Sequence, residues 1–386
     1  MSVKTIIGQA ATGENFFPRP EITKLFWDRI KSGNNILIAA PRRVGKTSLM
    51  KHFRDCPNEN YELIYTITQS VNNGNEFFKK LFKEIITLLN TKDKYKIHLK
   101  RFLESKKFTS LTSQGISFES IDADYFNDFK NAINLIDLKE VRLILLIDEI
   151  SETVENIIKD EGERNAIIFL EQNREIRQLS EVENKIQFVY TGSIGLENIV
   201  GKINAAKTIN DLYSLDVPPL KKPQAKELIG KITEGSEISL DDDAIDYILK
   251  RIAWFIPYYI QIIIDEIDKI PDIENRPVLE KDIDEAFNKA LSKKSYFQPW
   301  FERLRTAYKS DEFNFAKSVL NHTAENGKID KNVVYDYAVK YKLESLYIDI
   351  MNSLKHDGYI VLAENNKFYR FNSPLLQTWW SQNIAF

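Results

Sequence analysis

The sequence APRRVGKTS occupies residues 40–48, directly after the apolar run Asn35–Ala39 and before a helical pattern that begins near Thr47. Phosphate oxygens are bound by converging backbone N–H groups, by a helix N-terminus and by a cation. A strand–loop–helix segment that ends in Gly-Lys-Thr supplies all three. Ala40 stands where the usual G-x-x-x-x-G-K-[ST] pattern has its first glycine, and it keeps the small size of that position. The context therefore predicts a phosphate-binding loop rather than a chance helix start in a basic loop.

All nine residues of this loop are candidate nucleotide contacts. They are Ala40, Pro41, Arg42, Arg43, Val44, Gly45, Lys46, Thr47 and Ser48. We expect the Lys46 ammonium group to reach the terminal phosphates of a nucleoside triphosphate and so to act in catalysis. We expect the Thr47 hydroxyl to bind Mg²⁺.

A second motif consists of the fully apolar run 143–147 followed by two acids, Asp148 and Glu149. A carboxylate at the end of a buried parallel strand lies at the carboxyl edge of the sheet, where open α/β sheets bind their ligands. This is the Walker B form. It predicts that Asp148 lies near Mg²⁺ and that Glu149 is the general base for an attacking water. The alternative, two acids that only cap the next helix, loses weight beside the phosphate loop.

A third predicted strand, Ile186–Thr191, ends in a hydroxyl and is followed by Gly192 and Ser193. A hydroxyl at this edge would contact the γ-phosphate or position water, as a sensor does. Thr191 is the first candidate for this catalytic role and Ser193 is the second. A Thr-Gly-Ser turn can also end a strand for conformational reasons alone, and that structural role is the alternative.

The first half of the chain alternates short apolar runs with amphipathic stretches, as in a parallel sheet covered by helices. The runs are Asn35–Ala39, 63–68, 143–147, Ile186–Thr191 and, more weakly, 213–217. Residues 92–128 show little periodicity and are interpreted as a variable insertion. The pattern predicts an α/β fold in which a P-loop NTPase sheet is flanked by helices.

Helical spacing returns after Pro218 and Pro219 and continues to residue 291, which predicts an all-α lid. Three short helical patterns then lead to two extended runs, 359–362 and 368–371, with a polar turn at 364–366. Helices followed by such a hairpin predict a winged helix. The predicted domains are a P-loop ATPase core at 1–218, a helical lid at 219–295 and a winged-helix domain at 296–386.

The composition is that of a folded globular protein, with 43% hydrophobic and 28% charged residues. The net charge of -3 gives no general attraction to phosphate backbones, so nucleic-acid binding needs separate evidence. No apolar run approaches the length of a membrane helix, and no signal-like stretch follows the N-terminus, so we expect a cytoplasmic protein. With Cys56 as its single cysteine, the chain is not expected to hold an internal disulfide or a cysteine-based zinc site.

Together these motifs resemble those of the AAA+-related STAND and archaeal-type P-loop ATPases, which combine a P-loop domain, a helical lid and a C-terminal winged helix. The resemblance covers most of the chain and rests on residues 17–21, 40–49, 146–149, 191–193, 257–261 and 369–376. It implies that ATP and Mg²⁺ are bound. It also implies that Phe17 lies near the adenine and that Pro257 of the lid packs on the nucleotide. A proline that only opens a helix explains Pro257 equally well.

Arg174 and Arg177 lie on the helical pattern that precedes the third strand. A guanidinium group stabilises the charge that develops on a phosphoryl group in flight, so both residues, and Arg177 first, are candidate arginine fingers. Ordinary surface charges are the alternative.

The C-terminal region has few of the features of a DNA reader. The predicted second helix of its helix–turn–helix, residues 343–356, carries one lysine, and residues 300–386 contain 11 Lys and Arg against 10 Asp and Glu. Helices that bind DNA usually present several cations and amides. We therefore favour a role in protein contacts, with a second copy or another partner, or in packing on the ATPase core.

The leading hypothesis is a molecular switch that binds and hydrolyses ATP, and whose nucleotide state controls conformation, assembly or partner binding. The first alternative is a DNA-binding ATPase that uses its winged helix, similar to origin-recognition or transposition helpers. A nucleotide-binding scaffold without hydrolysis is disfavoured by Glu149, and a small-molecule kinase is disfavoured by the long C-terminal region.

Overall fold

The computed structural model describes residues 3–91, 111–112, 115–116, 124–135, 141–179, 185–192, 195–234, 236, 238–308, 310–363 and 366–385. The chain divides into two compact units. The sheet unit comprises Arg19–Ala39 and Leu49–Asp216, and the helical unit comprises the residues up to Pro18 together with Ala40–Ser48 and Val217–Phe386. The insertion interpreted at 92–128 lies mostly outside the described residues.

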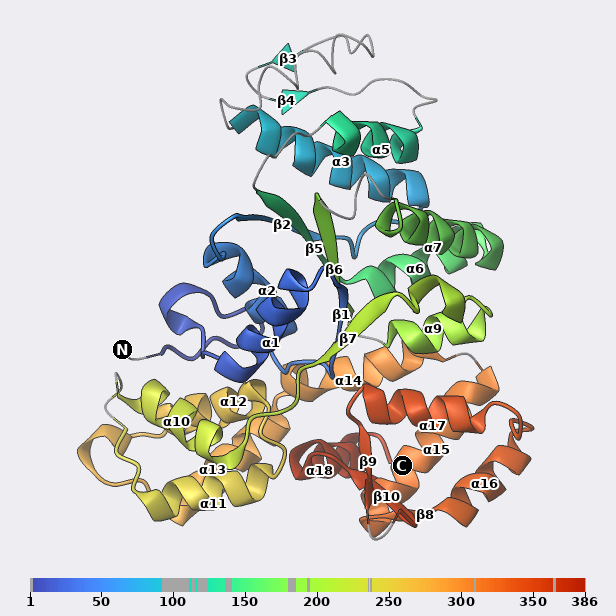
Figure 1. Ribbon diagram of the computed structural model, residues 1–386. Coiled ribbons are helices and arrows are strands. Elements are labelled where there is room, and N and C mark those ends of the chain that lie inside the picture. The colour runs from blue at the N-terminus through green and yellow to red at the C-terminus, as the bar shows by residue number, and fades with distance from the viewer. Residues whose placement is uncertain are drawn as a thin grey trace. The chain divides into compact units, whose positions relative to one another are not determined.

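A five-stranded parallel sheet organises the sheet unit (Figure 1). Each strand runs parallel to its neighbours. In spatial order the strands are β2 (Tyr61–Ile67), β5 (Arg142–Asp148), β6 (Ile186–Thr191), β1 (Asn35–Ala39) and β7 (Leu212–Asp216). The predicted parallel α/β sheet is confirmed, including its weakest run, which forms the edge strand β7.

Helices cover both faces of this sheet, which explains why its central strands are apolar without alternation. In β5, Leu143, Leu145 and Ile147 belong to one hydrophobic cluster, whereas Ile144 and Leu146 are equally buried but lie outside that cluster. The cluster receives residues from α3 (Gly74–Thr91), α5 (Tyr125–Leu135), α6 (Ile150–Glu161), α7 (Glu163–Arg177) and α9 (Leu196–Lys202).

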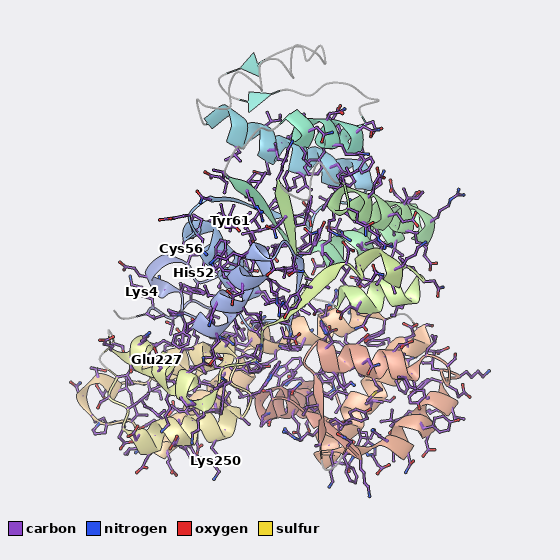
Figure 2. The ribbon with its side chains drawn as sticks, in the orientation of Figure 1. Lys4, His52, Cys56, Tyr61, Glu227 and Lys250 are labelled. Atoms are coloured by element: carbon purple, nitrogen blue, oxygen red, sulfur yellow. The ribbon has the colours of Figure 1, made fainter. Side chains whose placement is uncertain are left out.

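Helices α1 (Pro20–Lys31) and α2 (Lys46–Asp55) lie on the other side of the sheet (Figure 1). They are joined by aromatic packing, in which the rings of Phe26 and Phe53 stack with centroids 3.8 Å apart. Cys56 is exposed directly after α2 (Figure 2). The remaining elements of this unit are β3 (Leu111–Thr112), β4 (Gly115–Ile116) and the 3-10 helix η3 (Ala206–Ile209).

In its described residues, the region predicted to form the lid contains four α-helices. Two begin with recognisable signals: Asp241 accepts a hydrogen bond from the Ala244 amide before α11, and Pro257 is the first residue of α12. The elements are α10 (Lys222–Thr233), α11 (Asp242–Ile252), α12 (Pro257–Asp268), η4 (Ile273–Asn275) and α13 (Glu280–Ser292), with η1 (Gly13–Asn15) in the N-terminal segment.

The C-terminal part adds further helices and a three-stranded antiparallel sheet of order β8-β10-β9. The predicted hairpin runs correspond to β9 and β10, and residues 364–365 of the predicted turn lie outside the described residues. The two-residue strand β8 was not predicted, because a run so short has no measurable periodicity. The elements are α14 (Lys294–Ala307), α15 (Ser310–Asn326), β8 (Ile329–Asp330), α16 (Lys331–Lys340), α17 (Tyr347–His356), β9 (Ile360–Ala363), β10 (Phe368–Phe371) and α18 (Pro374–Asn383).

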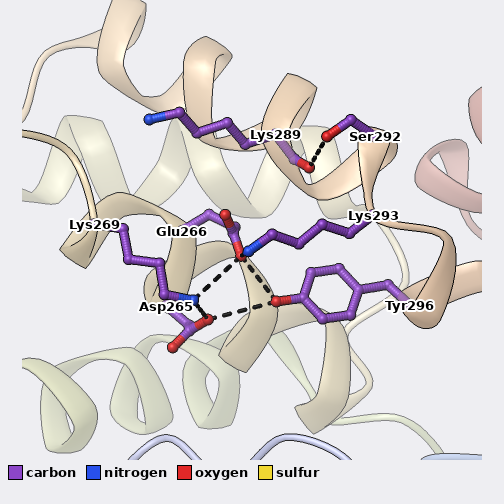
Figure 3. Close-up of polar contacts among 7 residues, drawn as sticks. All are labelled: Asp265, Glu266, Lys269, Lys289, Ser292, Lys293 and Tyr296. Atoms are coloured by element: carbon purple, nitrogen blue, oxygen red, sulfur yellow. Dashed lines mark hydrogen bonds and ion pairs between the residues drawn. The ribbon is translucent and has the colours of Figure 1, made fainter.

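A buried carboxylate, Glu266 of α12, joins this helix to Lys293, the residue between α13 and α14, and to Tyr296 of α14 (Figure 3). It is 1% exposed and accepts hydrogen bonds from the Lys293 ammonium group and from the Tyr296 hydroxyl, the latter at 2.8 Å. Burial alone would raise the pKa of Glu266, but these donors outweigh it and hold the pKa below its usual value. The charged form of Glu266 therefore belongs to the folded lid.

Asp282, near the start of α13, shows the same effect more strongly. It is 3% exposed, accepts two hydrogen bonds from Arg276 at 2.6 and 2.8 Å, and accepts a third from the Leu279 amide. The Arg276 hydrogen bonds, opposed by burial, lower the pKa of Asp282 to about 2.

Among the described residues, no helix combines the length and the apolar character needed to cross a membrane.

We expect Asp282→Asn to lower the free energy of unfolding by about 2 kcal/mol at neutral pH, because the charged form is favoured in the folded state. The folded pKa lies below the unfolded one, so this contribution is present above about pH 4 and is lost as pH falls towards 2. Urea unfolding at pH 7 and pH 3 should show a larger difference between the proteins at pH 7. A difference that is equal or larger at pH 3 would contradict the assignment.

Candidate functional site

The loop Ala40–Ser48 follows β1 directly and runs into helix α2. Two of its residues adopt left-handed backbone conformations, Arg43 with φ 65° and Gly45 with φ 102°. A Cβ on Gly45 would meet no atom within 4 Å, so the backbone angle and not lack of space requires glycine there. Left-handed residues within a tight loop make successive N–H groups converge, which creates an anion-binding concavity.

Lys46 is the first residue of α2 and is only 7% exposed. Its Nζ donates hydrogen bonds to the carbonyl oxygens of Ala40, at 2.7 Å, and of Pro41, at 3.0 Å. The ammonium group therefore lies across the first two residues of the loop. Thr47 is the next residue of the helix, where backbone N–H groups have no acceptor within the helix and the helix dipole is positive.

Asp148 is the last residue of β5 and is 2% exposed. One of its carboxylate oxygens, Oδ1, accepts a hydrogen bond from the Thr191 hydroxyl at the end of the neighbouring strand β6. The other, Oδ2, accepts one from the Tyr65 hydroxyl at 2.8 Å. The structure thus brings together two residues that were singled out independently from the sequence, Asp148 and Thr191.

Tyr65 was missed by the sequence analysis. It lies in β2, the strand on the other side of β5, and its register places it opposite Leu146. Burial, and then the negative charge of Asp148, raise the pKa of the Tyr65 phenol. Tyr65 therefore keeps its proton and donates to Asp148 at any physiological pH. The available signal was a tyrosine in the strand that precedes β5 in the sequence, but the sequence analysis did not predict that β2 and β5 are neighbours in the sheet.

Glu149, the next residue, has φ 63° and ψ 38°, a left-handed backbone conformation that residues other than glycine rarely adopt. It occupies the N-cap position of α6, and its side chain makes no capping hydrogen bond. The structure therefore does not support the alternative in which this acid caps the helix. A strained non-glycine residue costs about 1 kcal/mol and is typical of functional sites.

Two buried threonines hold the backbone around these acids. The Asp148 carbonyl accepts hydrogen bonds from the Thr68 amide at 2.9 Å and from the Thr68 hydroxyl at 3.1 Å. The Thr153 hydroxyl donates to Thr68, and the Thr153 amide donates to the Glu149 carbonyl at 3.2 Å. This network fixes the turn from β5 into α6, and no sequence motif marks either threonine.

Arg177 is 5% exposed and forms an ion pair with Asp211, with Nε 2.7 Å from Oδ2. Its Nη2 also donates to Asp211 and to the Thr208 carbonyl oxygen. These contacts join the end of α7 to η3 and to the residue before β7. The guanidinium group of Arg177 forms an ion pair with Asp211 in this structure. The arginine-finger role of Arg174 and Arg177 stays a prediction.

The other predicted contacts lie in the helical unit. Phe17 is buried beneath the ammonium group of Lys231, whose Nζ lies 5.2 Å from the ring centroid. Pro257 opens α12, as the helix-start interpretation expects. The contact of Phe17 with adenine stays a prediction, as does the contact of Pro257 with the nucleotide. Ser193 lies outside the described residues.

The donor set suits Mg²⁺ rather than a metal held by protein alone. Magnesium sites in nucleotide-binding proteins use one hydroxyl and one carboxylate, and the phosphates and water complete the octahedron. Thr47 and Asp148 are the predicted sources of these two groups, and their joint binding of Mg²⁺ stays a prediction. The buried Asp148 carboxylate, which two donors hold in one orientation, suits such a role. No group of three or more His, Cys, Asp or Glu residues suited to a metal occurs in the described part of the chain.

Two solved structures share this architecture over nearly their whole length. A Walker-type ATPase of Pyrococcus abyssi is 17% identical, with 97% of this chain and 99% of that one covered and a TM-score of 0.66. The ORC2 protein of Aeropyrum pernix, solved in ADPNP–ADP complexes, is 12% identical, with 94% and 93% covered and a TM-score of 0.54. No protein-family model and no curated protein matches the sequence. At these identities the likeness concerns the fold alone, and the chain therefore shares the fold of these two proteins, a P-loop α/β sheet flanked by helices and followed by helical domains.

Proposed function

We propose that this protein binds ATP with Mg²⁺ through residues 40–48 and Asp148, and that it hydrolyses the ATP. The observation that carries the proposal is the loop itself, in which left-handed Arg43 and Gly45 precede a helix that starts with a buried lysine. The loop follows a strand of the same parallel sheet whose strand β5 ends in Asp148. The ADPNP–ADP complexes of the similarly folded Aeropyrum pernix protein support the proposal.

The register of the sheet supports a shared site at one edge. Ile38 of β1 pairs with Thr191 of β6, and Tyr190 of β6 pairs with Ile147 of β5. Because these strands run parallel, their last residues lie along the same carboxyl edge, where open α/β sheets bind their ligands. Ala40 is bonded to the last residue of β1, so the loop begins at this edge as well.

Each residue has a distinct proposed role. The amides of the loop and the Lys46 ammonium group bind the phosphates, while Thr47 and Asp148 hold Mg²⁺. When bound, Mg²⁺ would neutralise charge on the phosphate oxygens. Thr191 and Tyr65 orient the Asp148 carboxylate through their hydrogen bonds. Glu149 orients the attacking water and accepts its proton.

The C-terminal part is proposed to be a winged helix that transmits the nucleotide state, as the resemblance to STAND ATPases implies. The element order α15-β8-α16-α17-β9-β10 supports this proposal. Four large apolar residues of α16 and the start of α17 are 43–57% exposed: Tyr335, Val339, Leu346 and Ile348. A gathering of exposed apolar side chains is typical of protein contact surfaces, and it supports a protein partner or a second copy.

DNA binding by the wing is a second candidate, and one observation favours it. The ammonium group of Lys328 lies 4.3 Å from the ring centroid of Phe368, and that of Lys331 lies 6.0 Å from the ring of Tyr369. Arg370 on the same strand is exposed. Cations interleaved with aromatic rings are a common nucleic-acid surface, but helix α17 adds a single lysine.

We expect Lys46→Ala to weaken ATP binding about 10- to 100-fold, since charge-assisted hydrogen bonds to phosphate are lost. Equilibrium binding of a fluorescent ATP analogue with Mg²⁺ would measure this. Lys31→Ala, which removes a lysine at the end of α1, is the matched control and should bind as the wild type does. Equal affinities for Lys46→Ala and the wild type would rule out the phosphate role of the loop.

For Glu149→Gln we expect unchanged ATP affinity and a turnover reduced about 10²- to 10⁴-fold, because a general base is removed without a change of shape. Glu149→Gly should lose turnover similarly yet raise the free energy of unfolding by about 1 kcal/mol, because glycine relieves the left-handed strain. Phosphate release and thermal unfolding would be measured for both variants. Near wild-type turnover in Glu149→Gln would show that Glu149 is not the base.

In a gel-shift titration of duplex DNA at low salt we expect no stable complex, because α17 offers one lysine and the region has a balanced charge. A complex that weakens steeply with salt and disappears in the double variant Lys331→Glu, Arg370→Glu would instead establish the DNA-binding alternative.

A further inference from the structure

The guanidinium group of Arg43, in the middle of the phosphate loop, lies 3.8 Å from the centroid of the Tyr258 ring. Tyr258 is the second residue of α12, directly after Pro257, and is 7% exposed. Its ring is held by neighbours, because the Tyr258 hydroxyl lies 3.4 Å from the Tyr296 carbonyl oxygen and the Tyr296 ring packs edge-on against it. Arg43 therefore rests on a fixed aromatic surface of the lid.

A second contact joins the same loop to the rest of the helical unit. A Cβ on Gly358 would lie 3.0 Å from Pro41 Cβ and 2.6 Å from the Trp254 ring, so these three residues meet at one point. Gly358 precedes β9, and Trp254 lies between α11 and α12. The loop thus contacts the rest of the helical unit through packing at Pro41 and through a cation–π interaction at Arg43. Only the Arg43 contact involves a group that a phosphate would attract.

Arg43 has two favourable kinds of partner. A cation over an aromatic face gains a modest electrostatic stabilisation, whereas a guanidinium–phosphate pair forms charge-assisted, often bidentate, hydrogen bonds that are stronger. A triphosphate bound by the same loop would therefore compete successfully for Arg43. The Tyr258 contact would then break, and the first turn of α12 would lose its attachment to the loop.

We propose that Tyr258 holds the Arg43 guanidinium group of the loop against α12, and that a bound triphosphate draws this group away onto its phosphates. This inference rests on the proposed ATP site. Breakage of the Arg43–Tyr258 contact would then transmit triphosphate binding in the loop to the first turn of α12. Because the contact opposes binding, it lowers the apparent affinity for triphosphate by the strength of the contact.

Tyr258→Leu removes the aromatic face, and we expect it to tighten MgATP binding about 2- to 30-fold, which is the strength of a partly desolvated cation–π contact. Tyr258→Phe keeps the ring but removes the hydroxyl, which also interacts with Arg43, so it should tighten MgATP binding less than Tyr258→Leu does. Tyr213→Leu is the matched control, since it removes a cation–π contact of the same kind, with Arg29 at 4.3 Å, and should leave affinity unchanged. In an Arg43→Ala background, Tyr258→Leu should have no effect.

Hydrogen–deuterium exchange tests the coupling without altering the lid core. MgATP should speed amide exchange in residues 256–264 of the wild type and leave it unchanged in Arg43→Ala. If the wild type binds MgATP but Tyr258→Leu binds equally well, or exchange at 256–264 does not respond, the inference is overturned and the proposed function stands. A wild-type protein without affinity for MgATP overturns both.

Discussion

The nucleotide chemistry proposed for this molecule depends on the positive end of helix α2. Its first residue, Lys46, is almost fully buried, and a buried ammonium group is costly unless it is paired. The carbonyl oxygens of Ala40 and Pro41 provide that pairing from within the loop. They are neutral acceptors, so a polyphosphate offers stronger ones. The loop therefore stabilises the Lys46 ammonium group by its own carbonyl oxygens. The proposed ATP binding requires that this group exchange those carbonyl oxygens for phosphate oxygens.

The acidic part of the site is built for rigidity. Asp148 is buried at the end of β5, and donors from both neighbouring strands, Tyr65 and Thr191, hold its two oxygens. Thr68 and Thr153 hold the backbone just beyond it, where Glu149 adopts a strained left-handed conformation. Such a network would keep the proposed catalytic groups oriented before substrate binds, as electrostatic preorganisation requires. The strain at Glu149 is tolerated because the surrounding hydrogen bonds determine the turn.

Much of this was predictable because the signals are local. Strands β1, β5 and β6 are buried on both faces and appear in the sequence as runs of mainly apolar residues. Asp148 and Thr191 were predicted separately as site residues, and their hydrogen bond in the structure is explained by one rule, that parallel strands end at a common edge. Tyr65, Thr68 and Thr153 were not predictable, because their contacts depend on how β2 pairs with β5 and on the turn from β5 into α6. The pairs Arg177–Asp211 and Arg43–Tyr258 were also missed, since they join residues distant in sequence and no motif records such partners.

Isothermal titration calorimetry of the wild-type protein with ATP, in the presence and absence of Mg²⁺, tests the central electrostatic claim most directly. Saturable binding at one site per chain, much stronger with Mg²⁺ than without it, is the predicted result, because the loop cation and the Asp148-bound ion act on the same phosphates. A protein that is folded by circular dichroism yet shows no affinity for ATP with Mg²⁺ would contradict it.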